Sequence, residues 1–160
     1  MNIGVINKRE IQISDGKTHK YLEMSIRPPF MESATFTISP NKKKENNEKA
    51  EPDFKIYYSY NRKNEKYRRV EVGAIWNKVS EGGIEYKSGN LQSPIFPGGI
   101  LYFSIFAAKP FEGEPLESIT WTHEVIWNPY RPNEEGNKNN TELKEINENY
   151  IEIDEDEIPF

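Results

Sequence analysis

Apolar and polar positions alternate with a period of two residues along most of the chain, which is typical of β-strands with one buried face. In the stretch YLEMSIR, Leu22, Met24 and Ile26 share one face, and mostly polar side chains occupy the other. Similar β-rich runs follow at 34–38, 53–60, 69–76, 84–91, 99–107 and 118–127, and a first strand is expected within 3–6 or 11–13. No helical period extends over eleven or more residues before residue 132.

Turn signals separate these runs, namely Asp15-Gly16, Pro28-Pro29, Gly82-Gly83, Pro97-Gly98-Gly99 and Glu112-Gly113. Seven or so short strands at spacings of roughly 10–20 residues predict an all-β fold, either a barrel or a sandwich. We favour a small antiparallel barrel, OB-fold-like, because closure removes exposed strand edges. The strand order, and whether the barrel is a true OB-fold, remain open from sequence.

Two positions in the 69–76 run bear on this expectation. Gly73 lies among large side chains and marks the bulge or bend that closure needs. Strict alternation places Trp76 on the same face as Val70 and Val72, so its ring suits the core as well as a ligand-stacking platform.

Composition then divides the chain. The segment 39–52 has no large apolar residue and is expected to be a mobile loop, and 133–150 has too few apolar residues to offset the entropy of ordering it. We therefore expect a barrel domain over 1–132, a flexible linker over 133–150 and a disordered acidic tail over 151–160.

Charge follows the same division. Residues 1–132 hold 19 Lys/Arg and 16 Asp/Glu, a net of +3, whereas 133–160 hold 2 and 10, a net of −8, and the whole chain carries −5. A mildly basic body with a strongly acidic tail suggests a nucleic-acid partner plus an interaction tail.

The residue inventory argues against most catalytic chemistry. The chain has no cysteine and two histidines, and it contains no H-E-x-x-H, Gly-rich phosphate loop or G-x-S-x-G motif. His123 is expected to be packed or half-exposed on a sheet, and His19 to be solvated. We expect no enzyme activity, no cofactor and no metal. The lack of cysteine and of signal-peptide or membrane-spanning stretches predicts a cytoplasmic protein without membrane contact.

Basic residues and rings interleave in the middle of the chain, between 54 and 90. Cations follow a phosphate backbone, and rings stack on unpaired bases at about 1–3 kcal/mol per base. The pattern also fits a charged hairpin tip with no ligand. The candidate nucleic-acid-binding residues are Lys55, Tyr57, Arg62, Lys63, Lys66, Arg68, Arg69, Trp76, Lys78, Tyr86 and Lys87.

The last ten residues resemble the C-terminal tip of bacterial single-stranded DNA-binding proteins (SSB), an acidic tail that ends in Asp-Ile-Pro-Phe and is bound by replication and repair enzymes. Here Ile158, Pro159 and Phe160 match, and Glu157 stands where aspartate is usual. The resemblance implies that the tail docks host proteins through Asp154, Glu155, Asp156, Glu157, Ile158, Pro159 and Phe160.

A second resemblance covers roughly 4–131. Pro-Asp-Phe at 52–54, Gly-Ala-Ile-Trp-Asn-Lys at 73–78, Gly-Ile-Glu-Tyr at 83–86 and Pro-Ile-Phe-Pro at 94–97 are similar to an uncharacterised family of short β-rich proteins encoded on conjugative plasmids and mobile elements. The segments 39–52 and 61–69 look like insertions relative to it. This resemblance implies a context in which single-stranded DNA is transferred.

The sequence therefore predicts a sequence-tolerant single-stranded DNA-binding protein that protects strands during replication or transfer of a mobile element or phage. Its tail would recruit host replication and repair proteins, and the tail would also occupy the basic face of its own barrel when DNA is absent. The alternative is an adaptor or inhibitor that mimics the SSB tail without binding DNA. An RNA-binding barrel is a third reading, and a homo-oligomer is compatible with all three.

Overall fold

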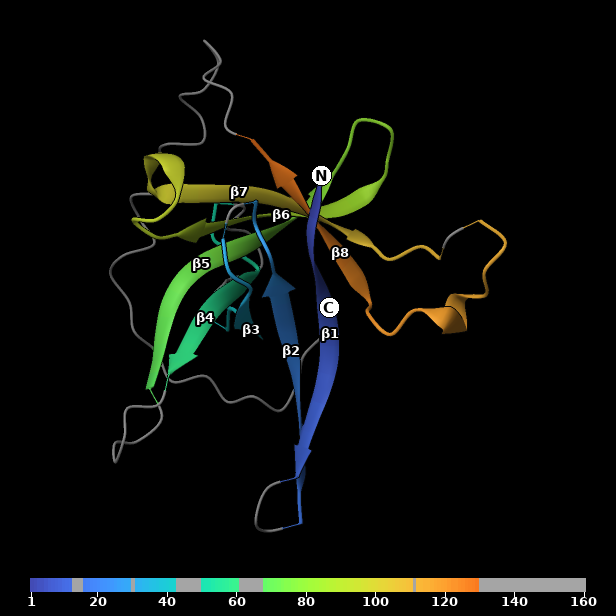
Figure 1. Ribbon diagram of the computed structural model, residues 1–160, viewed down its shortest axis with the longest axis horizontal. Helices are drawn as coiled ribbons and strands as arrows, with labels where there is room; N and C mark the ends of the chain where they lie inside the picture. The colour runs from blue at the N-terminus through green and yellow to red at the C-terminus, as the bar shows by residue number, and fades with distance from the viewer. Residues whose placement is uncertain (13–15, 30, 43–49, 61–67, 111, 130–160) are drawn as a thin grey trace.

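The computed structural model describes residues 1–12, 16–29, 31–42, 50–60, 68–110 and 112–129. Eight strands and two single-turn 3-10 helices make up the regular structure of these residues (Figure 1). The strands are β1 (Asn2–Gln12), β2 (Thr18–Ile26), β3 (Ala34–Pro40), β4 (Phe54–Tyr60), β5 (Arg68–Val79), β6 (Glu85–Gln92), β7 (Ile100–Ala107) and β8 (His123–Asn128). The 3-10 turns are η1 (Pro97–Gly99) and η2 (Leu116–Ser118).

The strands form one closed antiparallel barrel in which each strand pairs with its neighbours in sequence and β8 returns to pair with β1. The predicted class, an all-β small antiparallel barrel, is confirmed. The order is that of an up-and-down barrel, and its likeness to an OB-fold lies in its being a small closed antiparallel barrel. Among the described residues, no helix is long and apolar enough to cross a membrane.

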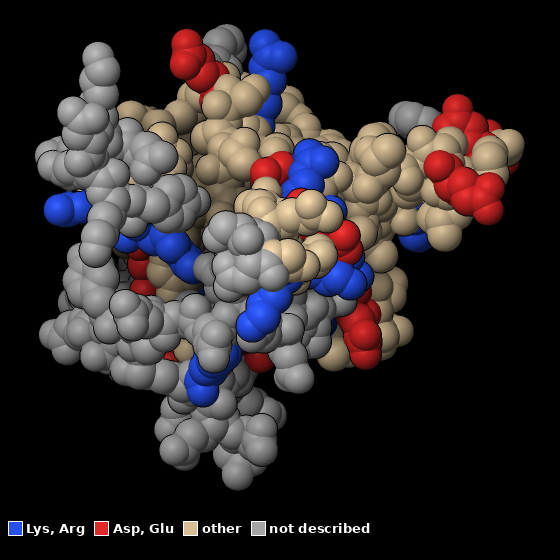
Figure 2. Space-filling model, turned by 90° about the horizontal axis from the view of Figure 1, so that it is seen from below, with Lys and Arg blue, Asp and Glu red and all other residues tan. Residues whose placement is uncertain are grey.

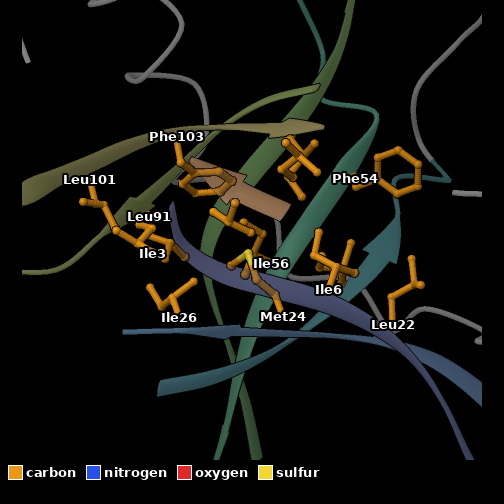
Figure 3. Close-up of a cluster of buried hydrophobic side chains, with 14 of the residues drawn as sticks. Ile3, Ile6, Leu22, Met24, Ile26, Phe54, Ile56, Leu91, Leu101 and Phe103 are labelled. Atoms are coloured by element: carbon orange, nitrogen blue, oxygen red, sulfur yellow. The ribbon is translucent and has the colours of Figure 1, made fainter. Parts of the chain in front are cut away.

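Alternation along the strands fills the barrel with aliphatic side chains. Ile6, Met24 and Phe103 are fully inaccessible, and every strand contributes to the same cluster (Figure 3). A small barrel of eight strands is just wide enough for side chains to fill its interior. The described core is therefore packed solid, and ligand sites have to be sought on the outside or at the two ends.

The predicted strand boundaries agree with the observed ones within a few residues, with two exceptions. β1 is a single strand that includes the candidate stretch 3–6 and the first two residues of the candidate stretch 11–13, whose last residue lies outside the described part of the chain. The last run begins later than predicted, because Leu116–Ser118 forms η2 and β8 starts only at His123, where its pairing with Ala107 begins. The predicted loop at 39–52 begins two residues later, since Ser39 and Pro40 belong to β3.

A bulge in β5 explains the position of Gly73. Ile56 pairs with Gly73 and Tyr57 with Glu71, so Val72 is the extra residue. A Cβ atom at Gly73 would collide with the carbonyl oxygen of Asn90. The bulge or bend expected at Gly73 is thus present.

The same bulge breaks the alternation and corrects one sequence-based assignment. Val72 packs against the core, whereas Trp76 follows the inward-facing Ile75 and so lies on the outward face. Trp76 and Val72 therefore do not share a face, because the additional residue shifts the alternation by one position.

Antiparallel order places the connections at two ends of the barrel. The end that contains the last residue of β4 is here called the Tyr60 end, and it also holds the start of β1 and the end of β8. The opposite end, called the His123 end, holds the start of β8 and the turns that join β1 to β2 and β5 to β6. The β1–β2 hairpin extends beyond the barrel, as seen at the bottom of Figure 1.

Candidate nucleic-acid interface

Three of the predicted binding residues, Lys55, Tyr57 and Arg69, meet on the outward face of β3, β4 and β5. Lys55 Nζ donates to Glu71 Oε2 at 3.3 Å, and both side chains are only 12% exposed. The Arg69 guanidinium lies 4.3 Å from the centroid of the Tyr57 ring. Its Nη2 donates to Ser39 Oγ at 3.2 Å. We call Lys55, Tyr57, Arg69 and Glu71 the outer cluster. Its charged groups interact with other groups of the protein.

Burial dominates the electrostatics of this cluster. Desolvation raises the pKa of Glu71, and the adjacent Lys55 ammonium opposes that rise. Desolvation, with a smaller contribution from Glu71, raises the pKa of Tyr57 to about 12, against the lowering effect of Arg69. The attraction within a buried ion pair offsets the free-energy cost of desolvating the two charges only when the geometry is good. Removing one partner lowers the stability of the fold, because it leaves the other charge buried and unpaired. The outer cluster is thus better suited to bracing three strands than to contacting a ligand directly.

The Trp76 side chain is also buried and hydrogen-bonded within the fold. The side chain is 6% exposed, and its indole Nε1 donates to the carbonyl oxygen of Ala50 at 3.0 Å. This bond ties the connection between β3 and β4 onto the outward face of β5. A base can stack on Trp76 only if that connection moves.

A different set of rings is accessible at the Tyr60 end. The centroids of Phe36 and Tyr58 are 6.1 Å apart with their planes tilted by 58°, and those of Tyr58 and Tyr60 are 6.5 Å apart with planes 22° from parallel. Tyr58 is 44% exposed. We call Phe36, Tyr58 and Tyr60 the aromatic row. It continues the inward face of β3 and β4 past the buried core to the opening of the barrel.

Arg68 and Val70 border the aromatic row on β5. Arg68 is exposed and pairs across the strands with Tyr60, while Val70 pairs with Tyr58 and is 37% exposed. A cation beside a line of accessible rings is the combination that single-stranded nucleic acid requires, because the rings receive bases and the cation receives phosphate.

The sequence-based list of sites includes Tyr57 and omits the aromatic row. Tyr57 and Tyr58 are neighbours, so they point to opposite faces of β4. One sequence pattern could have indicated the aromatic row. Ile56, Tyr58 and Tyr60 occupy alternate positions on the inward face of the strand, and the last two of these positions, just before the predicted hairpin tip, carry aromatic rings. Inward-facing residues at the end of a barrel strand pass beyond the packed interior and become accessible.

The remaining described candidates, Lys78, Tyr86 and Lys87, lie together at the His123 end. Lys87 Nζ donates to Asn77 Oδ1 at 3.0 Å and lies 5.7 Å from the centroid of the Phe54 ring. The Tyr86 ring stacks on Phe106, with centroids 5.8 Å apart. The structure thus separates the candidate residues into the outer cluster, the Tyr60 end and the His123 end.

Several predicted residues lie outside the described part of the chain. These are Arg62, Lys63 and Lys66, the linker at 133–150, and the tail, with Asp154, Glu155, Asp156, Glu157, Ile158, Pro159 and Phe160. The described residues themselves contain 12 Lys/Arg and 12 Asp/Glu. The positive excess of residues 1–132 therefore comes from segments that the structure does not describe.

Charge is unevenly distributed over the surface. In Figure 2, basic and acidic side chains mix across the face of the barrel, whereas acidic side chains gather on the loop that projects to the right. The β7–β8 connection carries the exposed Glu112, Glu114 and Glu117. The aromatic row lies on strands away from that connection. Within the described residues, no group of three or more His, Asp or Glu side chains is placed to hold a metal ion.

The fold and these surfaces define a small closed β-barrel with the aromatic row at one end and Lys78, Tyr86 and Lys87 at the other. The family model described as "Protein of unknown function (DUF736)" matches residues 14–129, and the chain belongs to this family. That match spans β2 to β8 and most of the described barrel. No curated protein and no solved structure matches the chain.

Proposed function

We propose that the protein binds single-stranded DNA without sequence preference, through the aromatic row at the Tyr60 end. The observation that carries this proposal is the series of rings in which the exposed Tyr58 lies between the half-buried Phe36 and Tyr60, with Arg68 directly across from Tyr60. Every base has a π-face, so a row of rings grips a strand whatever its sequence.

The segment between Tyr60 and Arg68 supports the same assignment. Its sequence, NRKNEKY, contains Arg62, Lys63 and Lys66 against one acid, and the two residues that flank it belong to the proposed interface. Cations attached here are suited to following the phosphate backbone away from the rings. The nucleic-acid-binding candidates in this proposal are therefore Tyr58, Tyr60, Arg62, Lys63, Lys66 and Arg68.

The resemblance of the chain end to the SSB tip supports a second role, in recruitment. Phe160 and Pro159 suit an apolar pocket on a partner, and the terminal carboxylate and upstream acids suit a basic rim. In this proposal the barrel holds the strand and the tail brings replication or repair proteins to it. The similarity to short proteins of mobile elements favours strand transfer as the setting.

Fluorescence anisotropy of a labelled thymidine 30-mer tests the DNA interface. We expect Tyr58→Ala and Tyr60→Ala each to weaken binding by roughly 5- to 150-fold, which corresponds to about 1–3 kcal/mol per stacked base. Tyr58→Phe and Tyr60→Phe are the matched controls, and they should bind as the parent does, because stacking needs the ring and not the hydroxyl. Equal affinity for all four variants would contradict the assignment.

Salt dependence tests the role of Arg68. Arg68→Gln should reduce the slope of log affinity against log salt concentration by about 0.7, the value for one phosphate contact on a single strand. Lys109→Gln removes the same charge from an exposed site beyond β7 and should leave the slope unchanged. A slope that changes equally in both variants would mean that only the overall charge matters.

The alternative function, an adaptor that carries an SSB-like tail without binding DNA, is favoured by one observation. The described residues have no net charge, so they provide no general attraction for a polyanion. Removal of Ile158–Phe160 separates the two functions. For the DNA-binding protein we expect unchanged oligonucleotide affinity and loss of replication and repair proteins from a bacterial pull-down. An adaptor would lose the same partners but show no oligonucleotide binding before or after truncation.

A further inference from the structure

A pocket of about 470 Å³ opens at the His123 end, where the β5–β6 hairpin meets the end of β7 and the start of β8. Its lining residues are Asn77, Lys78, Val79, Glu85, Tyr86, Lys87, Ile105, Ala107 and His123. All of them belong to described strands, and none belongs to the aromatic row. This pocket is thus a separate feature of the molecule.

The pocket has an apolar floor and a basic wall. Ile105 is 1% exposed and belongs to the barrel core, so the pocket ends on packed side chains. Lys87 pairs across the strands with Ile105 and therefore faces the same side. Its ammonium is held beside Asn77 Oδ1 and above the Phe54 ring. Lys87 is thus placed at a fixed point rather than extended into solvent.

Positive groups outnumber negative ones around the pocket. Lys78 and Lys87 line it with His123, and Glu85 is the acid among its lining residues. The carboxylates of Asp53 and Glu85 both act on the Lys87 ammonium. The charges of Lys87 and of Lys8 on β1 both act on the His123 ring. Burial lowers the pKa of His123, and these two ammonium groups lower it further. An anion in the pocket would relieve this mutual repulsion.

The hydrogen bonds of His123 determine which ring nitrogen titrates. Thr122 Oγ1 donates to the carbonyl oxygen of Ile6 at 3.2 Å. Having used its proton, the hydroxyl accepts from His123 Nδ1–H at 2.9 Å. Nε2 is then the nitrogen that takes up a proton when the ring becomes charged. A bound anion and a proton on Nε2 would stabilise each other.

We propose that this pocket binds a phosphate group, held by Lys87, Lys78 and protonated His123. Phosphate is favoured over a carboxylate because its two negative charges can pair with the two lysines that line the pocket, while it also accepts a hydrogen bond from a protonated His123. The stacked Tyr86 and Phe106 rings lie beside the pocket, and Phe106 is 40% exposed. An aromatic base on the phosphate would find a stacking partner there, which favours a nucleotide over the free ion.

Nuclear magnetic resonance of the histidine rings tests this site directly. The chain has two histidines, so His19, on the β1–β2 hairpin, is an internal reference for His123. The full-length protein is titrated with inorganic phosphate, with thymidine monophosphate and with thymidine, at constant pH and ionic strength. We expect His123 to shift with both phosphate compounds, at lower concentration with the nucleotide, and not to shift with thymidine. The bound anion should also raise the pKa of His123.

The variants separate this site from the proposed DNA interface. Lys87→Gln should weaken the response of His123 to the nucleotide at least tenfold, which is the expected minimum for a charge-assisted hydrogen bond. Lys20→Gln, whose side chain is 74% exposed in an ion pair with Glu10, is the matched control and should leave it unchanged. Lys78→Gln provides a second test if Lys87→Gln lowers stability. Tyr58→Ala should not alter the response.

Three results would overturn the proposal. In the first, the His123 signal shifts with neither phosphate compound. In the second, it shifts as much with thymidine as with the nucleotide. In the third, the shift caused by the nucleotide is unchanged in both Lys87→Gln and Lys78→Gln. None of these results bears on oligonucleotide binding at the Tyr60 end, so failure of the phosphate site and failure of the DNA interface are distinguishable.

Discussion

Tyr57 and Tyr58 are consecutive residues with opposite environments. The Tyr57 ring is 8% exposed and lies under the Arg69 guanidinium, whereas the Tyr58 ring is 44% exposed in the aromatic row. The difference follows from the alternation of side chains across β4, together with the cover that Arg69 provides on the outward face. Burial therefore makes Tyr57 a structural residue, and exposure leaves Tyr58 available to a ligand.

Burial of Tyr57 makes stability sensitive to high pH. Its pKa is about 12 in the folded barrel against 10 in the unfolded chain, so the folded state holds the phenolic proton more tightly. The associated stability, at most about 2–3 kcal/mol, is complete below pH 10 and is lost as pH rises toward 12. Urea unfolding between pH 8 and 11 should show that Tyr57→Phe loses less stability than the parent above pH 10.

The matched control for that series is Tyr58→Phe, which removes the same hydroxyl from a residue that is 44% exposed instead of 8% exposed. Its stability should follow the parent at every pH. If Tyr57→Phe also followed the parent up to pH 11, the Tyr57 hydroxyl would be solvated in the folded protein, and the outer cluster would be more open than the structure indicates.

Within single elements, β5 carries the largest departure from regularity. It is the longest strand, with 12 residues, and the bulge at Val72 lets its first half follow β4 while its second half continues along β6. Gly73 sits at the turning point, directly against the backbone of Asn90. A bulge of this kind increases local twist, which a closed barrel of eight strands needs.

Gly73→Ala should therefore destabilise the barrel by about 1–3 kcal/mol or more, because the obstructing atom is a backbone oxygen that cannot rotate away. Urea unfolding at neutral pH measures this loss. Gly82→Ala is the control, since its Cβ would meet only Ser80 Oγ at 3.9 Å, and its effect should stay within about 0.5 kcal/mol. Equal stability of the two variants would mean that β6 shifts easily and that the bulge does not fix the register.

The strands themselves were predictable, because the inward face of each one carries apolar side chains at alternate positions. Leu22, Met24 and Ile26 define β2 in the sequence and are all buried in the barrel. The sequence also indicated a bulge at Gly73. Local pattern could not reveal that Ala50 accepts from Trp76 across 26 residues, or that Arg69 reaches Ser39 across 30. Such contacts depend on strand order, which no local period encodes.

The candidate site shows the same limit. The basic and aromatic composition of residues 54–90 was visible in the sequence, but the division into a buried outer cluster, an aromatic row and a pocket was not. Lys55 illustrates the reason, since its partner Glu71 is 16 residues away on the next strand. Whether a cation is available to a ligand depends on which acid the fold places beside it.

For the whole molecule, closure of the barrel is complete at residue 128. β8 pairs with both β7 and β1, and the Trp127 amide donates to the Met1 carbonyl oxygen at 2.9 Å, so residues 1–128 close the barrel by themselves. The chain beyond Pro129 should therefore contribute little to stability. Ending the chain after Pro129 should leave the thermal midpoint within about 2 °C of that of the full chain.

Differential scanning calorimetry measures that midpoint. A variant that ends at residue 122 lacks β8, and its thermal unfolding is compared with that of the variant that ends at Pro129. We expect the shorter version to lose cooperative unfolding, because β1 and β7 would both have a free edge. A fall of more than about 5 °C after truncation at Pro129 would show that residues 130–160 belong to the folded unit.

The pairing of the first strand with the last also has a consequence for biosynthesis. Protein synthesis proceeds at about 5–20 residues per second, so the residues of β8 are made roughly 6–25 s after those of β1. During this time the edge of β1 that pairs with β8 is unpaired. Pairing with β8 covers only Asn2 to Ile6. The part of β1 that stays unpaired on that side begins Asn7-Lys8-Arg9-Glu10, and charged residues of this kind deter a neighbouring chain from adding to the edge. We therefore expect the charged half of β1 to hinder association of the nascent chain with other copies during synthesis.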